Sequence, residues 1–194
     1  IYLYTAGGTG LEATIPSWAF EGGTEKLFER LNDPETRERL KREIVEGSPG
    51  WWNIVEASGG WENIILVNAR NEQNARFEGN SIAAIAKELN EDPADTAFDL
   101  VLQGSARVYA LYFMMSEDDI ITALKFPWTS IGSDAGAALK PGEVDTLGLP
   151  HPRSYGNHPR LIARFVRDKG VISLEEAVRK MTSWPATRLR IPER

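Results

Sequence analysis

The chain has 194 residues, of which 42% are apolar and 26% charged, and it contains no cysteine. This composition is that of a globular protein, and it excludes a disordered chain, a disulfide scaffold and any cysteine-based metal site. No apolar run approaches the roughly 20 residues that span a bilayer, and no signal-peptide pattern opens the chain. We therefore expect a cytoplasmic protein with no membrane partner. The start at Ile1, without an initiator Met, suggests a truncated sequence.

The formal net charge is −6, but the region from His158 to Arg194 is basic, with nine Lys or Arg against four Asp or Glu. A basic region is one indicator of nucleic-acid binding. Aromatic residues do not alternate with these basic positions as a stacking surface requires, so solvated helix faces are the favoured interpretation. We expect no nucleic-acid partner.

Helix-capping residues predict a series of helices along the chain. Asp33 followed by Pro34 is a typical helix start, and Ser173 with Glu176 forms a capping box. Ser81, Asp92 and Ser116 are further N-cap candidates. The predicted helices are 25–31, 34–45, 82–89, a helix from 93, 117–125, 160–169, 174–182 and a short one after Pro185.

Runs of aromatic and β-branched residues predict strands at 2–5, 64–67, 107–113 and 129–132, with loops at 6–10 and 137–156. The second half alternates helices and strands, which is typical of α/β architecture with parallel strands. Residues 22–79 fit this rhythm poorly and are predicted to be a helix-rich insertion.

The block Ile131–Gly136 places one carboxylate, Asp134, directly after a predicted strand. In parallel α/β folds and (β/α)8 barrels, functional groups lie at that end of the strands. A single Asp in this position is also a common turn former. The spacing alone leaves both interpretations open.

Two further segments contain candidate binding residues. His151–Arg160 combines two His-Pro pairs with arginines, whose planar fork suits a carboxylate; a loop that these arginines pin to local carbonyls is the alternative interpretation. Tyr2 and Tyr4 are predicted to share one strand face, where a hydroxyl can donate to an oxyanion, but two half-buried structural tyrosines are the favoured reading.

Other features give weaker signals. Gly7–Gly10 lacks the Gly-Lys-Ser/Thr of a phosphate loop and the dinucleotide fingerprint. Trp51, Trp52 and Trp61 can form a ligand platform, but packing in a core or an oligomer interface is the favoured interpretation. His151 and His158 are the only histidines, so a complete His-rich zinc site within this sequence is nearly excluded.

Together the segments YLYTAGGTGL, FPWTSIGSDAGA, HPRSYG and SLEEAVRKMTSWPA resemble the N-acyl-D-amino-acid deacylases, the D-aminoacylase branch of the amidohydrolase superfamily. The resemblance covers nearly the whole chain. It implies the C-terminal part of a metal-dependent (β/α)8 barrel with a helix-rich insertion. The implied segments are 1–21 (late barrel strand and loop), 22–79 (insertion) and 80–194 (C-terminal barrel segment).

The resemblance implies a zinc-dependent hydrolase that cleaves the amide bond of N-acyl-D-amino acids. The family's metal-binding histidines match no residue of this chain, so we expect the isolated chain to be inactive. Asp134 matches the aspartate that contacts the metal and handles protons, and Arg153 matches the arginine for the substrate α-carboxylate. Tyr4, with Tyr2 as the alternative, matches the tyrosine near the scissile carbonyl, and His151 is a further substrate-binding candidate. Leu3 and His158 stand where the family usually has Pro and Phe.

Two alternatives remain open at this point. One is another amidohydrolase that acts on a cyclic amide or a dipeptide. The other is a non-catalytic oligomerisation or structural module, in which the tryptophans and charged helices mediate self-association. Because a partial barrel exposes strand edges, a homo-oligomer paired through sheet edges is also expected.

Overall fold

The computed structural model describes residues 1–135 and 151–192, which form two compact units. The sheet unit is Ala6–Met114. The helical unit combines Ile1–Thr5 with residues 115–135 and 151–192. The predicted segments change at 21/22 and 79/80, whereas the described chain passes between the units after Thr5 and after Met114.

A three-stranded sheet organises the sheet unit. Its strands are β1 (Gly7–Gly10), β2 (Ile64–Asn68) and β3 (Tyr109–Tyr112), in the order β1-β3-β2, and both pairings are antiparallel. Tyr112 lies opposite Gly7 on one side and Ile64 on the other. The parallel arrangement predicted from the helix-strand rhythm is therefore wrong for the described strands. Alternation along a chain indicates where strands lie, but not the direction in which distant strands meet.

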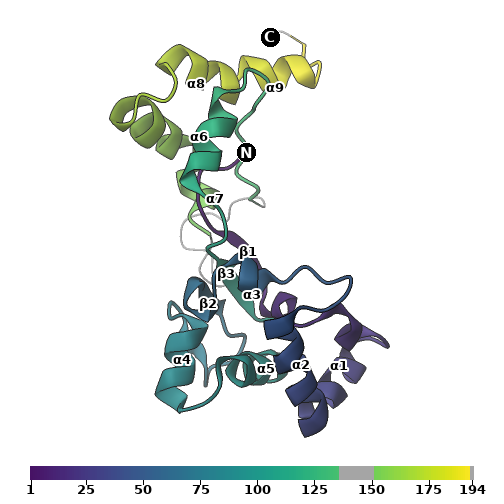
Figure 1. The fold of residues 1–194 in the computed structure, drawn as a ribbon. Helices are drawn as coiled ribbons and strands as arrows, with labels where there is room; N and C mark the ends of the chain where they lie inside the picture. Colours follow the sequence, from purple (N-terminus) through teal and green to yellow (C-terminus); the bar gives the residue numbers. More distant parts are fainter. Residues whose placement is uncertain (136–150, 193–194) are drawn as a thin grey trace. The chain divides into compact units, whose positions relative to one another are not determined.

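Helices pack around this sheet (Figure 1). Asp33 accepts a hydrogen bond from the Thr36 N–H at 2.9 Å, Ser81 from the Ala84 N–H at 3.1 Å and Asp92 from the Ala94 N–H at 2.9 Å, so these predicted N-caps are confirmed. Helix α1 packs on α2, and α4 packs on α5. The α-helices are α1 (Thr24–Asn32), α2 (Pro34–Glu46), α3 (Ile54–Ala57), α4 (Ile82–Leu89) and α5 (Pro93–Gln103), and the 3-10 turns are η1 (Leu11–Thr14), η2 (Ser17–Phe20), η3 (Trp61–Asn63) and η4 (Ala75–Phe77).

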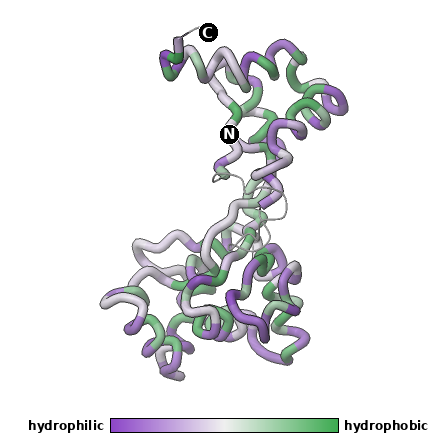
Figure 2. The backbone as a smooth tube through the Cα atoms, turned by 180° about the vertical axis from the view of Figure 1, so that it is seen from behind, coloured by the Kyte–Doolittle hydropathy of each residue, from purple (hydrophilic) through white to green (hydrophobic). Residues whose placement is uncertain are grey.

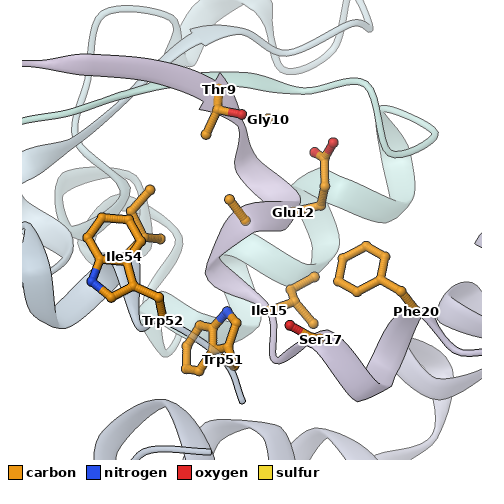
Figure 3. A pocket seen from close by; sticks show the side chains of 10 residues that line it. Thr9, Gly10, Glu12, Ile15, Ser17, Phe20, Trp51, Trp52 and Ile54 are labelled. Atoms are coloured by element: carbon orange, nitrogen blue, oxygen red, sulfur yellow. The ribbon is translucent and has the colours of Figure 1, made fainter.

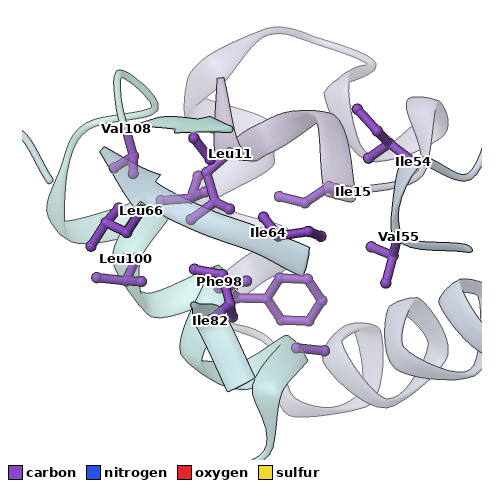
Figure 4. Packing of buried hydrophobic residues seen from close by; sticks show 14 of the residues in the cluster. Leu11, Ile15, Ile54, Val55, Ile64, Leu66, Ile82, Phe98, Leu100 and Val108 are labelled. Carbon is purple, nitrogen blue, oxygen red and sulfur yellow. The ribbon is translucent and has the colours of Figure 1, made fainter. Parts of the chain in front are cut away.

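The core of the sheet unit joins strand residues to helix residues that are distant in sequence. Figure 4 shows Ile64 and Leu66 of β2 among the side chains of Phe98, Ile82 and Leu11, and all five are fully buried. Burial of each such side chain contributes about 1.5–3 kcal/mol to folding. Along the helices the backbone alternates between hydrophilic and hydrophobic residues, as amphipathic helices require (Figure 2).

The helical unit has its own small core, formed by Leu3, Ile120, Leu124, Ile131, Leu161, Phe165 and Ala177. Its elements are α6 (Glu117–Lys125), α7 (Arg153–Arg160), the π-helical segment η5 (Leu161–Asp168), α8 (Leu174–Met181) and α9 (Ser183–Arg188). The predicted caps Ser116 and Ser173 accept the Asp118 N–H at 3.0 Å and the Glu176 N–H at 3.2 Å. No helix among the described residues is both long and apolar enough to cross a membrane.

Three local predictions differ from the structure. Residues 2–5 and 129–132 are not strands, and the predicted glycine loop at 6–10 contains β1 instead. The end of the predicted loop 137–156 is the first turn of α7, while residues 136–150 lie outside the described part. The helix predicted over 160–169 begins earlier in the structure, because α7 starts at Arg153, contains Pro159 and continues directly into η5.

Glu117 joins the start of α6 to the end of η5. Its carboxylate accepts hydrogen bonds from Arg164, at 3.1 Å from Nη2, and from Lys169. These hydrogen bonds hold the pKa of Glu117 at about 2. Because a lowered carboxyl pKa stabilises the fold only while the group is charged, this contribution is complete above the ordinary pKa of 4.5 and is lost as the pH falls toward about 2.

We therefore expect the urea midpoint of the helical unit to fall between these pH values, and Glu117→Gln to remove part of that dependence. Glu176, whose pKa Arg179 also lowers to about 2, supplies a second part. Glu46→Gln, at an exposed position in the sheet unit, is the control and should leave the profile unchanged. An unaltered pH profile in Glu117→Gln would contradict the assignment.

Candidate functional site

The five residues predicted from the sequence as site residues all lie in the helical unit, on three separate segments. Tyr2 and Tyr4 come from the first residues, Asp134 follows the core residue Ile131, and His151 and Arg153 lie at the start of α7. The structure brings these segments together. Arg153 Nη2 lies 3.0 Å from Asp134 Oδ2.

Asp134 is the exposed member of this ion pair, with 71% of its side chain accessible. Its backbone has a φ of 51°, in the left-handed region where Asp and Asn are the most frequent non-glycine residues. The backbone therefore turns at Asp134, and the carboxylate is available both to solvent and to Arg153. The carboxylate does not lie in an aliphatic core.

Arg153, by contrast, is buried, with 9% of its side chain accessible. Its guanidinium lies 4.6 Å from the centre of the Tyr2 ring, and its backbone N–H donates to His151 Nδ1 at 3.0 Å. An imidazole nitrogen that accepts this hydrogen bond carries no proton, so His151 in its neutral form is protonated on Nε2. The buried guanidinium thus contacts an aromatic face and a carboxylate, while the backbone of Arg153 is held by His151.

Tyr2 and Tyr4 both make edge contacts with the His151 ring, at centroid distances of 5.9 and 5.5 Å. They do so although residues 2–5 do not form the predicted strand. The Tyr4 hydroxyl lies directly against Gly156, where a Cβ would collide with it. The guanidinium of Arg160 lies 4.7 Å from the centre of the Tyr4 ring, so an aromatic and cationic environment surrounds this phenol.

Asn157 is a site residue that the sequence reasoning missed. Its side chain is buried in α7, where Oδ1 accepts the Leu3 N–H at 2.8 Å and Nδ2 donates to the Gly132 carbonyl at 3.0 Å. One carboxamide therefore joins the segment of Tyr2 and Tyr4 to the segment of Asp134. The only sequence signal is the position of Asn157 directly before a His-Pro pair. This position does not indicate which distant backbone groups the side chain contacts.

Leu3 takes part in the same connection. Its carbonyl accepts a hydrogen bond from Arg160 Nε at 2.6 Å, and its side chain is fully buried in the core of the helical unit. A proline at this position would lack the N–H that Asn157 accepts. Leu3, which stands where the deacylase family usually has Pro, therefore supplies a backbone N–H, and Asn157 accepts it.

The described residues do not form a metal site of their own. No group of three His, Asp or Glu side chains in this part of the chain is arranged to hold a metal ion. Asp134 offers an accessible carboxylate, but His151 uses Nδ1 to accept a hydrogen bond. A metal ion beside Asp134 would need ligands from outside the described residues.

Comparison with curated proteins shows related sequences. The chain is 36% identical over 118 residues to the D-aminoacylase of Alcaligenes xylosoxydans xylosoxydans, covering 61% of this chain and 22% of that protein. It is 32% identical over 116 residues to the N-acyl-D-glutamate deacylase of the same organism, covering 60% of this chain and 21% of that protein. The chain is a relative of the N-acyl-D-amino-acid deacylases. It spans about a fifth of the length of these proteins, and no family model matches it.

Solved structures of deacylases agree with this relationship. A D-aminoacylase with a binuclear metal center superposes with a TM-score of 0.58 at 25% identity, covering 100% of this chain and 29% of that chain. The N-acyl-D-glutamate deacylase of Bordetella bronchiseptica, in complex with zinc and a phosphonate inhibitor, gives 0.56 at 23% identity, which supports the fold alone, with 91% of this chain and 41% of that chain covered. The resemblance predicted from the sequence is confirmed, and the names of these relatives do not favour a cyclic-amide hydrolase or a non-catalytic module.

Proposed function

We propose that this deacylase relative is part of a zinc-dependent hydrolase that cleaves the amide bond of N-acyl-D-amino acids. The observation that carries the proposal is the ion pair between exposed Asp134 and buried Arg153, with Tyr2, Tyr4 and His151 beside it. Relatives named as deacylases of D-amino acids, D-glutamate and D-aspartate support the substrate class.

Arg153 is the proposed binding residue for the substrate α-carboxylate. Its guanidinium already holds a carboxylate oxygen, that of Asp134, at 3.0 Å. Burial of the guanidinium strengthens its pairing with a carboxylate, although water partly screens the present pair because Asp134 is 71% exposed. A substrate carboxylate that takes the place of Asp134 on Arg153 would leave the Asp134 carboxylate free to act on the amide.

Asp134 is the proposed proton carrier. Its carboxylate takes a proton from the water that attacks the amide carbonyl, and it delivers that proton to the leaving nitrogen as the C–N bond breaks. The products are the released carboxylic acid, as its carboxylate, and the free D-amino acid. The 71% accessible side chain allows both transfers.

Tyr4 is the proposed donor to the carbonyl oxygen, on which negative charge develops during attack. Its hydroxyl position is set by Gly156, and its ring is held by Arg160 and His151. Tyr2, whose ring supports Arg153, is proposed to act on the carboxylate side of the substrate with His151.

Zinc in such an enzyme acidifies a bound water and polarises the carbonyl. We propose Asp134 as one of its ligands, with the others outside this sequence. Because the described residues do not form a metal site, the steps assigned to this chain are binding by Arg153, proton transfer by Asp134 and orientation by Tyr4. We further propose that the chain is the late part of a (β/α)8 barrel into which residues 22–79 are inserted, and that the isolated chain is inactive.

The carboxylate role of Arg153 can be tested in the complete protein of which we propose this chain to be a part. Arg153→Ala is expected to raise KM for N-acetyl-D-amino acids by about 10- to 100-fold, because a charged hydrogen-bonding partner of the substrate is lost. The same variant should hydrolyse the carboxamide analogues, which lack the α-carboxylate, as the parent does. KM values from steady-state kinetics provide the measurement.

Arg167→Ala is the matched control, because Arg167 is exposed and pairs with its neighbour Asp168. An unchanged KM in Arg153→Ala would exclude the carboxylate role while leaving the hydrolase assignment intact. Equal hydrolysis of D- and L-substrates, or none with zinc supplied, would instead contradict the proposed function itself.

A further inference from the structure

A cavity of about 610 Å³ lies in the sheet unit (Figure 3). It is lined by Thr9, Gly10, Glu12, Ala13, Ile15, Ser17, Phe20, Trp51, Trp52 and Ile54. All of these residues belong to Ala6–Met114, whereas the candidate site residues above all belong to the helical unit. The volume falls within the range of about 300–1,000 Å³ that is typical of small-molecule sites.

The walls of the cavity are mainly aromatic and aliphatic. Figure 3 shows Glu12 and Phe20 on one side of the cavity, and Trp51 and Trp52 on the other. Trp51 also packs against the core, as the sequence interpretation favoured, but Trp52 is 65% exposed. Core packing therefore does not explain the exposed position of Trp52. Exposed aromatic faces of this kind attract organic cations.

Glu12 is the charged residue among the described residues that line this cavity. Its Oε2 atom is buried without a hydrogen-bond partner, and its carboxylate lies against Gly10, where a Cβ would collide with it. Burial raises the pKa of Glu12. A buried carboxylate oxygen with no partner costs free energy, so folding alone does not explain its position.

We propose that this cavity binds a primary ammonium group attached to an aromatic or aliphatic body. The ammonium would donate to the Glu12 carboxylate, and the apolar body would lie between Phe20 and the two tryptophans. An anion is disfavoured because the lining offers a carboxylate and no cationic side chain among the described residues. This binding is additional to the proposed deacylase activity and does not depend on it.

The test is calorimetric titration of the full chain with 2-phenylethylammonium. Three analogues of the same body separate the contributions: 2-phenylethanol lacks the charge, the trimethylammonium analogue keeps the charge but cannot donate, and phenylacetate reverses the charge. We expect the ammonium to bind about tenfold more tightly than the alcohol, the trimethylammonium analogue to fall between them, and phenylacetate not to bind.

Two variants assign the binding to the cavity. Glu12→Gln, which preserves the side-chain shape, is expected to weaken ammonium binding about tenfold, and Trp52→Ala to weaken it several-fold. Trp128→Ala is the matched control, because Trp128 is 64% exposed but belongs to the helical unit, and it should bind like the parent. Circular dichroism and thermal melts establish that each variant is folded.

The proposal is overturned by equal affinity for all four compounds, which would indicate hydrophobic adsorption only. It is also overturned by no detectable binding of the ammonium at millimolar concentration, or by parent-like affinity in folded Glu12→Gln. Loss of binding in Trp128→Ala would place the site in the wrong unit and contradict it as well.

Discussion

Asp134→Asn in the complete protein is expected to lower kcat for N-acetyl-D-amino acids by about 10²- to 10⁴-fold, the range that a general acid-base residue contributes. Asparagine preserves the shape of the side chain but cannot accept the proton of the attacking water. Because Asp134 is 71% exposed and packs into no core, the variant should fold as the parent does. Steady-state kinetics over a pH range provide the measurement.

Separate measurement of kcat and of KM distinguishes a catalytic from a positioning role of Asp134. If Asp134 served only to hold Arg153 in place, its loss would raise KM and leave kcat and the acidic limb of the pH profile unchanged, and that result would contradict the proton-transfer role. In the proposed mechanism Asp134 competes with the substrate for Arg153, so KM should remain equal or fall. Asp118→Asn, at an exposed position on α6, is the control and should retain parent kinetics.

Asn157→Ala is expected to lower the free energy of unfolding of the helical unit by about 2–4 kcal/mol, because it leaves the Leu3 N–H and the Gly132 carbonyl without their partner. In the complete protein it should also reduce kcat/KM by about 100-fold, since Tyr4 and Asp134 are no longer held relative to each other. Urea unfolding and the hydrogen-exchange rate of the Leu3 amide are the measurements.

Asn157→Asp distinguishes the two hydrogen bonds. An aspartate still accepts from the Leu3 N–H but cannot donate to Gly132, so slow exchange at Leu3 should persist while the Asp134 segment loosens. His158→Ala, at the exposed next position of α7, is the control. Parent-like exchange at Leu3 in Asn157→Ala would show that the carboxamide does not hold the N-terminal segment.

The hydrogen bond between the Leu3 N–H and Asn157 can also be broken from the Leu3 side. Leu3→Pro removes the same hydrogen bond from the backbone side and would place a ring where a buried leucine packs. Because Leu3→Pro and Asn157→Ala break the same hydrogen bond, the double variant should lose less free energy of unfolding than the sum of the two single losses.

The sequence by itself determined five of the helices that begin with a polar cap, but not the short α3, which Asn53 caps. Asp33, Ser81, Asp92, Ser116 and Ser173 start helices as predicted, because an N-cap satisfies backbone donors within three residues and needs no distant partner. The resemblance carried by the HPRSYG and SLEEAVRKMTSWPA blocks pointed to the N-acyl-D-amino-acid deacylases, to which the comparisons also relate the chain.

Only the tertiary structure decided how distant segments meet. The antiparallel order β1-β3-β2 pairs β3 with β1, about a hundred positions earlier in the chain, and with β2, about 45 positions earlier. The glycine-rich β1 gave no strand signal because glycine has no side chain to pack. The site likewise combines Tyr4, Asp134 and Arg153 through the buried carboxamide of Asn157. Contacts of this kind depend on packing and on hydrogen-bond partners far along the chain, which residue type and spacing do not specify.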